Sequence, residues 1–314
     1  MRSCSSPIST SSPRHRPAWP AATTSPTGKP PDGTAGDFQR PAVPSGSVAS
    51  ARVTTRLPWE DLTEDVRDII GAQTGPVLKA EPICDGYNSE IAVIVHTEHA
   101  RTFVKGLRTE HPRVWTQRRE QAINPHVAGI AARLRWAVET EGWHLLGFEV
   151  IDGRPMDYSP GSADLPKLRD VLGRLGRIPC PDLGLKHAEQ RWSGFSDSSG
   201  LFAGAALLHT ELSPGNVLIT ETSAHLVDWA WPTRGASWID PACAVVWLVA
   251  FGHTPADAEQ WAAQLPAWHT ATPTHLAAFA QAQHTMWASI AQDHPDAWLL
   301  RVAHGAQRWA QHRR

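Results

Sequence analysis

One short segment, His209 to Ile219, carries side chains whose types and spacing suit a specific chemistry. It reads His-Thr-Glu-Leu-Ser-Pro-Gly-Asn ahead of an apolar run, so that a carboxylate at Glu211 precedes a carboxamide at Asn216. A second apolar run ends at the carboxylate of Asp228. Phosphoryl transfer from a nucleotide needs one carboxylate to orient the acceptor hydroxyl, and an amide and a second carboxylate to hold metal ions on the phosphates. The segment therefore predicts this chemistry.

The segment resembles the catalytic loop of the aminoglycoside phosphotransferase and choline kinase family of small-molecule phosphotransferases. The motif His-x-Glu-x-x-x-x-Asn is followed by Asp228 and then by Asp240 in the order that the family uses, and the resemblance is specific over residues 205 to 242. It implies an α+β, two-lobed, protein-kinase-like fold with a small antiparallel-sheet N-lobe and a larger, mainly helical C-lobe. It also implies ATP and Mg²⁺ as cofactors, and transfer of the γ-phosphate of ATP to a hydroxyl of a small molecule.

The resemblance also implies a role for each polar residue of the loop. Asn216 and Asp228 are the expected Mg²⁺ ligands, and Glu211 occupies the position of the catalytic base. His209 is expected to brace the loop through hydrogen bonds, and Asp240 to anchor the C-lobe.

Glu211 departs from the family pattern, which has Asp at this position. The extra methylene adds about 1 Å of reach, and a misplacement on that scale can cost on the order of 100-fold in rate. From the sequence alone we expect an active enzyme in which Glu211→Asp keeps or raises turnover. The alternative is a nucleotide-binding protein with weak or no turnover.

Two charged residues of the first half are expected at the nucleotide. The ammonium of Lys105, in the predicted third strand, can reach nucleotide phosphates, as a strand lysine does in the kinase template. Glu120, in a predicted helix, is expected to pair with Lys105 and to hold it toward the phosphates. The alternatives are an exposed strand lysine and one more charge on a solvated helix face.

Two turns complete the expected nucleotide site. The turn between the first two strands contains Gly86 and Ser89, and small residues with free backbone N–H groups suit contact with phosphates. An apolar strand runs through Glu149 and Ile151 into Gly153. This strand suits the hinge between the lobes, and its backbone is expected to meet the adenine edge. Each pattern is also consistent with an ordinary strand and turn.

The elements that must position these residues follow from hydrophobic periodicity and turn residues. A helix is predicted from Pro58 to Ile70. Further N-lobe strands are predicted over residues 76–83, 91–96, 102–107, 134–138 and 144–151, and a helix over residues 112–122. Turn-like residues separate the first three strands, which therefore form a β-meander.

The second half of the chain changes to helical patterns. Apolar residues at spacings of three and four predict a helix with one buried face over residues 164–175. Two short strands carry the amide and the second carboxylate of the loop motifs. Residues 241–312 are mostly helical, with Asp240 as the N-cap and Pro241 at the first helical position.

Three regions follow from these patterns. Nine of the 26 prolines fall in the first 44 positions, so residues 1–53 are expected to form a disordered Pro/Ser-rich tail. Residues 54–152 form the N-lobe with its nucleotide-binding sheet. Residues 153–314 form the helical C-lobe with the catalytic and metal-binding loops.

Composition narrows the class of protein. Hydrophobic residues make up 41% and charged residues 19%, as in ordinary soluble proteins. The net charge of -2 gives no attraction to nucleic acid or to membranes, and the longest apolar run, Ala242 to Phe251, is too short to span a bilayer. The four cysteines are far apart, which argues against a disulfide framework and a zinc site. We expect a cytoplasmic monomer or weak dimer that acts on a small molecule.

The acceptor pocket of the family is built from the helical lobe, so the composition of that lobe bears on the substrate. Between Pro241 and Arg314 there are four acidic residues, four arginines, seven histidines and six tryptophans. A polycationic aminoglycoside calls for an acidic cleft, so a neutral or partly aromatic hydroxyl compound fits better. A third class of function, a structural helical protein with an accidental motif, predicts that Lys105, Asn216 and Asp228 lie apart.

Overall fold

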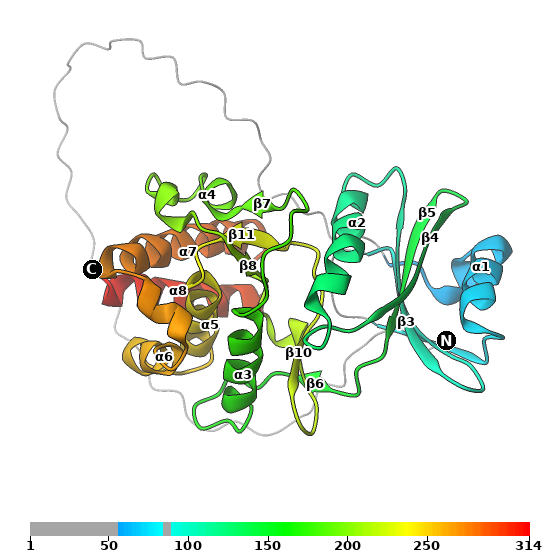
Figure 1. Ribbon diagram of the computed structural model, residues 1–314, viewed down its shortest axis with the longest axis horizontal. Helices are drawn as coiled ribbons and strands as arrows, with labels where there is room; N and C mark the ends of the chain where they lie inside the picture. The colour runs from blue at the N-terminus through cyan, green and yellow to red at the C-terminus, as the bar shows by residue number, and fades with distance from the viewer. Residues whose placement is uncertain (1–55, 84–88) are drawn as a thin grey trace, which may run out of the picture. The chain divides into compact units, whose positions relative to one another are not determined.

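The computed structural model describes residues 56–83 and 89–314 of the chain (Figure 1). The tail expected over residues 1–53 lies outside the described residues, and so does the turn residue Gly86. Within them, a five-stranded antiparallel sheet is followed by a mainly helical region. This arrangement confirms the predicted α+β class.

The N-lobe is built on this sheet. Its strands, in spatial order, are β1 (Lys79–Pro82), β2 (Ile91–His96), β3 (Arg101–Arg108), β5 (Trp143–Glu149) and β4 (Leu134–Thr140). The first three strands form the predicted β-meander, and the register places Lys105 of β3 between Ala92 of β2 and Leu146 of β5. Lys105 therefore lies on a central strand that is paired on both sides.

Helices cover both faces of this sheet. α1 (Glu64–Thr74) packs against Val104 and other apolar side chains on one face. α2 (Val114–Ile123) lies on the opposite side of the sheet (Figure 1). Because successive side chains of a strand point to opposite faces, Val104 faces α1 and Lys105 faces α2. The pleat of β3 thus directs the Lys105 ammonium toward the helix that carries Glu120.

The C-lobe consists of helices and two small sheets. Its longer helices are α3 (Leu165–Leu175), α5 (Ile239–Ala250), α6 (Pro255–Ala262), α7 (Pro273–Asp293) and α8 (Ala297–His312). One sheet has the order β10 (Ala224–Leu226), β9 (Val217–Ile219), β6 (Arg154–Pro155), and the other β7 (Lys186–His187), β11 (Thr233–Gly235), β8 (Ala206–Leu208). The short helices of both lobes are η2 (Trp59–Asp61), η3 (Asn124–Val127), α4 (Ala188–Arg191), η4 (Ser199–Phe202), η5 (Pro214–Asn216) and η6 (Pro266–Thr270).

α5 is the central helix of the C-lobe. Every residue from Ile239 to Val249 is buried, as expected for a helix that is apolar on all sides. Helix α8 approaches α5 so closely that a Cβ atom on Gly305 would lie 2.7 Å from the backbone nitrogen of Ala250. The packed α5 is therefore a rigid support for the loops that meet its N-terminal end.

The structure corrects the predicted start of this helix. α5 begins at Ile239 with Trp238 as its N-cap, so the prediction of Asp240 as the N-cap is wrong. The carboxylate of Asp240 instead accepts hydrogen bonds from the backbone N–H groups of His209 and Thr210. Asp240 thus serves a neighbouring loop rather than its own helix, and local capping preferences could not reveal that contact.

Most of the other predicted elements are present, with shifted ends. The strand predicted over residues 91–96 coincides with β2, whereas the helix predicted from Pro58 to Ile70 is interrupted and continues to Thr74. The strands β6, β7, β8 and β11 were not predicted, because two- and three-residue strands are too short to show a period. The equally short β9 and β10 were predicted only because they lead into the loop motifs. Among the described helices, none combines the length and the apolar character that a membrane span requires.

Candidate functional site

A sharp turn after β8 presents the first candidate catalytic residues. Thr210 has a φ angle of 71°, in the left-handed region that β-branched residues rarely adopt. Asp240 stabilises this turn, because its two carboxylate oxygens accept hydrogen bonds from the N–H groups of His209 and Thr210, each at 2.8 Å. Helix α5 thereby fixes the loop at the point where Glu211 follows β8.

The buried ring of His209 braces the same loop from the other side. Its Nε2 donates to the carbonyl of Val227 at 3.0 Å, and its Nδ1 accepts from the N–H of Glu211 at 3.3 Å. A ring with one donating and one accepting nitrogen is a neutral imidazole, and burial lowers the pKa of His209 to about 4. Both nitrogens are engaged, which supports the bracing role and argues against proton transfer by His209.

A hairpin brings the two expected metal ligands together. β9 and β10 pair antiparallel, and the N–H of Val227 donates to the carbonyl of Asn216 at 2.9 Å. Asp228 follows directly with a φ angle of 62°, a backbone strain of the kind that clusters at functional sites. The Nδ2 of Asn216 donates to the carbonyl of Glu211 at 3.1 Å. The amide oxygen of Asn216 is therefore the end of the side chain that can bind a cation.

Lys105 joins the sheet to this hairpin. Its Nζ donates to Glu120 at 2.8 Å and to Asp228 at 2.8 Å, and all three side chains are largely buried. The predicted ion pair of Lys105 with Glu120 is thus present. Burial alone would lower the pKa of Lys105, but Asp228 and Glu120 outweigh it and hold the pKa above its usual range. Burial raises the pKa of Glu120, while Lys105 outweighs burial at Asp228 and lowers the pKa there.

The donor atoms of this cluster fit a magnesium ion. A single ammonium stands between two carboxylates, so the cluster of Lys105, Glu120 and Asp228 keeps an excess of negative charge. Asp228 and Asn216 offer the carboxylate and carboxamide oxygens that Mg²⁺ prefers. Within residues 56–83 and 89–314 no group of three or more His, Cys, Asp or Glu could hold a metal. Two protein ligands supplemented by water and phosphate oxygens are the usual arrangement for Mg²⁺.

Comparison with known proteins identifies the fold. No protein-family model and no curated protein match the sequence, but solved structures are similar. Choline kinase LicA from Streptococcus pneumoniae has a TM-score of 0.55 at 12% identity, covering 79% of this chain and 98% of its own. A putative aminoglycoside phosphotransferase from Ralstonia eutropha has a TM-score of 0.54 at 13% identity, covering 79% and 96%. A thermostable mutant of aminoglycoside phosphotransferase APH(4)-Ia has a TM-score of 0.51 at 12% identity, covering 78% and 99%.

The chain has a protein-kinase-like fold. The fold is not all-helical. The third class of function, a structural helical protein with an accidental motif, predicted that Lys105, Asn216 and Asp228 lie apart. Lys105 bonds to Asp228, and Asp228 follows the residue that bonds to Asn216. The three residues therefore lie together and not apart.

Within this kinase-like fold, Glu211 has a partner that the sequence analysis missed. The Nη2 of the buried Arg191 donates to Oε1 of Glu211, and the side chain of Arg191 is 5% exposed against 35% for Glu211. Burial raises the pKa of Glu211, and the positive charge of Arg191 opposes that rise. The guanidinium also lies over the ring of Trp231, 5.5 Å from its centroid. Glu211 is therefore held as one half of an ion pair.

Two features explain why the sequence did not reveal these contacts. Arg191 ends the single-turn helix α4, in a region with no readable period. Tyr158, also missed, donates from its hydroxyl to the carbonyl of Leu212 at 2.7 Å and so fixes the far side of the loop. Neither residue belongs to a motif, since each acts through a tertiary contact alone.

The described residues include the predicted hinge and only the last residue of the predicted phosphate turn, Ser89. Glu149 ends β5, and both its N–H and its carboxylate bond to the backbone of Arg133. The carbonyl of Ile151 accepts from a turn N–H at 2.9 Å. These bonds remove the Glu149 N–H from any contact with adenine, so such a contact must use other backbone groups of the hinge. Ser89 is buried just before β2, and its contact with phosphate stays a prediction.

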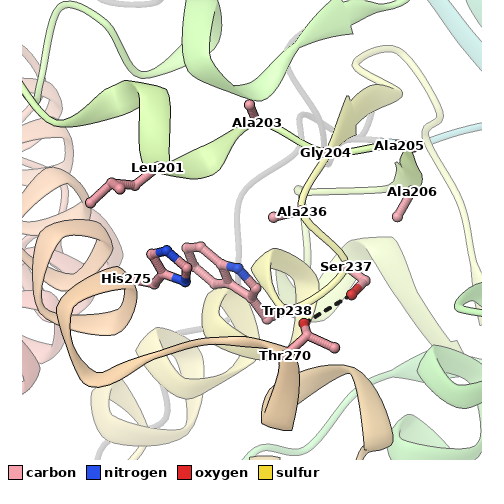
Figure 2. A pocket seen from close by; sticks show the side chains of 10 residues that line it. All are labelled: Leu201, Ala203, Gly204, Ala205, Ala206, Ala236, Ser237, Trp238, Thr270 and His275. Carbon is pink, nitrogen blue, oxygen red and sulfur yellow. Dashed lines mark hydrogen bonds between the residues drawn. The ribbon is translucent and has the colours of Figure 1, made fainter.

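Two cavities of the described residues are candidates for the acceptor site. The larger, about 320 Å³, is lined by Leu201, Ala203, Gly204, Ala205, Ala206, Ala236, Ser237, Trp238, Thr270 and His275 (Figure 2). Figure 2 shows the His275 ring stacked on Trp238 and the hydrogen bond between Ser237 and Thr270. It contains none of the candidate catalytic residues. The smaller cavity, about 60 Å³, includes Glu211 in its lining and is the better candidate.

Proposed function

We propose that this protein is an ATP-dependent phosphotransferase that moves the γ-phosphate of ATP to a hydroxyl of a small molecule. The observation that carries the proposal is the pair of hydrogen bonds from Lys105 to Glu120 and to Asp228. This contact joins a central strand of the sheet to the hairpin that carries Asn216. Burying a lysine between two carboxylates costs desolvation energy. Phosphate binding by Lys105 accounts for a cluster that is costly to bury.

Each residue has a task in the proposed reaction. Lys105, fixed by Glu120, is placed to bind phosphate oxygens of the nucleotide. Asn216 and Asp228 would hold Mg²⁺, which neutralises charge on the phosphates when it is bound. Glu211 orients the acceptor hydroxyl and accepts its proton as the oxygen attacks the γ-phosphorus. On this proposal residues 54–152 carry the nucleotide, and residues 153–314 carry the catalytic loop and the acceptor.

Structural neighbours support nucleotide binding. LicA has been solved in complex with AMP, and the APH(4)-Ia mutant in a ternary complex with AMP-PNP and hygromycin B. The nucleotide in this chain is proposed to occupy the corresponding place beside Lys105.

A direct test is ADP release with MgATP across a panel of hydroxyl compounds, run beside the Asp228→Asn variant. We expect acceptor-dependent ADP release from the native protein and none above background from the variant. Calorimetry with ATP in the presence and absence of Mg²⁺ measures binding separately. A protein that shows no nucleotide- and metal-dependent binding would sink the proposal.

The second candidate is a kinase-like nucleotide-binding protein with weak or no turnover. The ion pair of Glu211 with Arg191 favours it, because a paired carboxylate is less available to an acceptor hydroxyl. Binding of MgATP without ADP release for any acceptor would support this candidate and contradict the enzyme.

A further inference from the structure

The smaller cavity opens beside Glu211 and is enclosed mostly by helices of the C-lobe. It is lined by Arg191, Trp192, Thr210, Glu211, Cys243, Trp247, Gln283, Met286, Trp287 and Ile290. Six of these side chains are aromatic, aliphatic or sulfur-containing, and its volume of about 60 Å³ suits a compact molecule. A mostly apolar wall with a few polar groups is the usual form of a small-molecule site.

The lining carries no net charge. Its charged members are Arg191 and Glu211, which bond to one another. Burial raises the pKa of the Cys243 thiol well above its usual value, so that residue is neutral. A polycation finds here only one carboxylate, already paired with a guanidinium, and an anion finds a guanidinium already paired with a carboxylate. Charge therefore favours an uncharged ligand.

The polar groups of the lining are mostly engaged or covered. Nε of Arg191 and Nε1 of Trp192 have no hydrogen-bond partner in the described part of the chain, but both nitrogens are covered by neighbouring atoms. The Thr210 hydroxyl donates to the carbonyl of His209, and Oε1 of Gln283 accepts from Trp287.

The cavity therefore selects mainly by shape and by the absence of an unpaired charge. Burying a charge without a partner costs far more than burying a neutral hydroxyl group. Arg191 and Trp192 are both more than nine-tenths buried, so the wall next to Glu211 is firmly packed.

We propose that this cavity holds the phosphoryl acceptor, and that the acceptor is a compact, uncharged, largely apolar alcohol. The inference rests on the proposed function and names the substrate class of the same site. The hydroxyl oxygen of the alcohol forms a bond to the γ-phosphorus, the bond from that phosphorus to the bridging oxygen of ADP breaks, and the hydroxyl proton passes to Glu211. The products are a phosphate monoester and ADP.

The test is ADP release with MgATP for sets of size-matched alcohols. Each set contains two neutral members and two charged members. The neutral members are a hydroxy-ester, hydroxy-ketone or hydroxy-ether and an alkanol without the second oxygen, and the charged members are the matching hydroxy-carboxylate and a quaternary ammonium alcohol. One such set is methyl 3-hydroxybutyrate, 2-heptanol, 3-hydroxybutyrate and choline. We expect kcat/KM for the two neutral members to exceed kcat/KM for the charged members by about tenfold or more, because the lining offers a charged ligand no unpaired partner.

Failure of this inference can be told apart from failure of the proposed function. Highest kcat/KM for the charged members, or no turnover of any neutral member while MgATP still binds, overturns the acceptor class and leaves the nucleotide site standing. Loss of MgATP binding in calorimetry is instead the failure of the proposed function.

Two matched variants separate binding from folding. Trp192→Phe changes the shape of one wall of the cavity and keeps an aromatic ring, and we expect KM for the neutral alcohols to change several-fold with little change in kcat. Trp268→Phe changes another buried tryptophan of the C-lobe that does not line the cavity, and we expect KM to stay the same. Equal effects of the two variants on KM would contradict the proposal.

Discussion

At the residue proposed as the catalytic base, the contact of Glu211 with Arg191 gives the extra methylene a structural explanation. Seen in the sequence, the longer side chain looked like a misplaced carboxylate. In the structure that carboxylate reaches a guanidinium that comes from α4 and is itself held by Trp231. The length of Glu211 is therefore matched to the position of Arg191.

This match reverses the expectation for Glu211→Asp. An aspartate is about 1 Å too short to reach Arg191, and the loss of a partner for a buried charge is destabilising. We now expect kcat to fall on the order of 10- to 100-fold, which is the scale of a 1 Å misplacement. Steady-state ADP release measures the change, and MgATP affinity should stay the same because Glu211 contacts neither Lys105 nor Asn216 through its carboxylate. Unchanged or higher kcat would show that Arg191 does not set the required length, as the sequence alone suggested.

Asp240 is the residue whose titration is most open to measurement. Burial raises its pKa from 3.8 to about 6, although the N–H groups of His209 and Thr210 and the charge of Arg191 act in the opposite direction, and Glu211 adds to the rise. The native state therefore binds the proton more tightly than the unfolded chain. Its contribution to stability is fully present below pH 3.8 and is lost as the pH rises through 6.

The variant Asp240→Asn isolates this contribution. A change of about two pKa units corresponds to about 3 kcal/mol. We compare the free energy of unfolding of the native protein with that of the variant. The difference, native minus variant, should decrease by up to this amount between pH 4 and pH 7. Urea titrations at several pH values measure the difference. The lowered pKa of His209 affects both proteins equally and cancels. A difference that rises with pH would mean that the two backbone N–H groups keep the Asp240 carboxylate ionised.

At the scale of elements, the position of the candidate catalytic loop depends on how tightly α5 is packed. Asp240 can position the loop only if α5 itself cannot shift, and close contact with α8 at Gly305 restrains it. A side chain at this crossing would push the two helices apart. The stability of the helical pair is therefore linked to the geometry of the site.

Two glycine substitutions test this packing. Gly305→Ala places a Cβ within 3 Å of Ala250, and overpacking of this kind costs about 1–3 kcal/mol. Gly71→Ala, in α1, meets nothing within 4 Å, and the higher helix propensity of alanine should stabilise the protein by up to about 1 kcal/mol. Thermal unfolding compares the two variants with the native protein. Equal effects of both substitutions would show that the crossing of α5 and α8 is not restrictive.

The type of a helix or strand could be predicted where its hydrophobic pattern extends over enough residues to be recognised. The β-meander of β1, β2 and β3 follows from short strand-like runs separated by turn residues, and the buried face of α3 follows from apolar spacings of three and four. Single-turn helix α4 shows no such period, yet it carries Arg191. The part of the site that was missed thus lies in the element with the least regular sequence.

At the scale of the whole molecule, Lys105 is the contact through which a nucleotide would couple the sheet to the catalytic hairpin. Its ammonium bonds to α2 on one side and to Asp228 on the other. A ligand that binds only the native state stabilises it, by about 2.7 kcal/mol at 100 times its Kd. MgATP should therefore raise the melting temperature by several degrees.

The variant Lys105→Met should remove this MgATP-dependent shift. Lys79→Met is a matched control, because Lys79 is also a strand lysine but is exposed and pairs only with Glu81 among the described residues. Lys105→Met leaves two buried carboxylates without their cation and should also lower the melting temperature without ligand, whereas Lys79→Met should not. Differential scanning fluorimetry with and without MgATP measures both effects. An undiminished shift in Lys105→Met would place the nucleotide elsewhere.

The chain alone was enough to indicate the kinase-like fold, the order of the loop residues and the pairing of Lys105 with Glu120. These features depend on local periods, on short motifs and on residues 15 positions apart on neighbouring elements. The tertiary structure alone decided the contact of Lys105 with Asp228 across 123 positions, the pairing of Glu211 with Arg191, and the mostly apolar cavity beside them. Such contacts depend on how packed helices and strands place buried charges, and desolvation makes each buried charge seek a partner that no local pattern encodes.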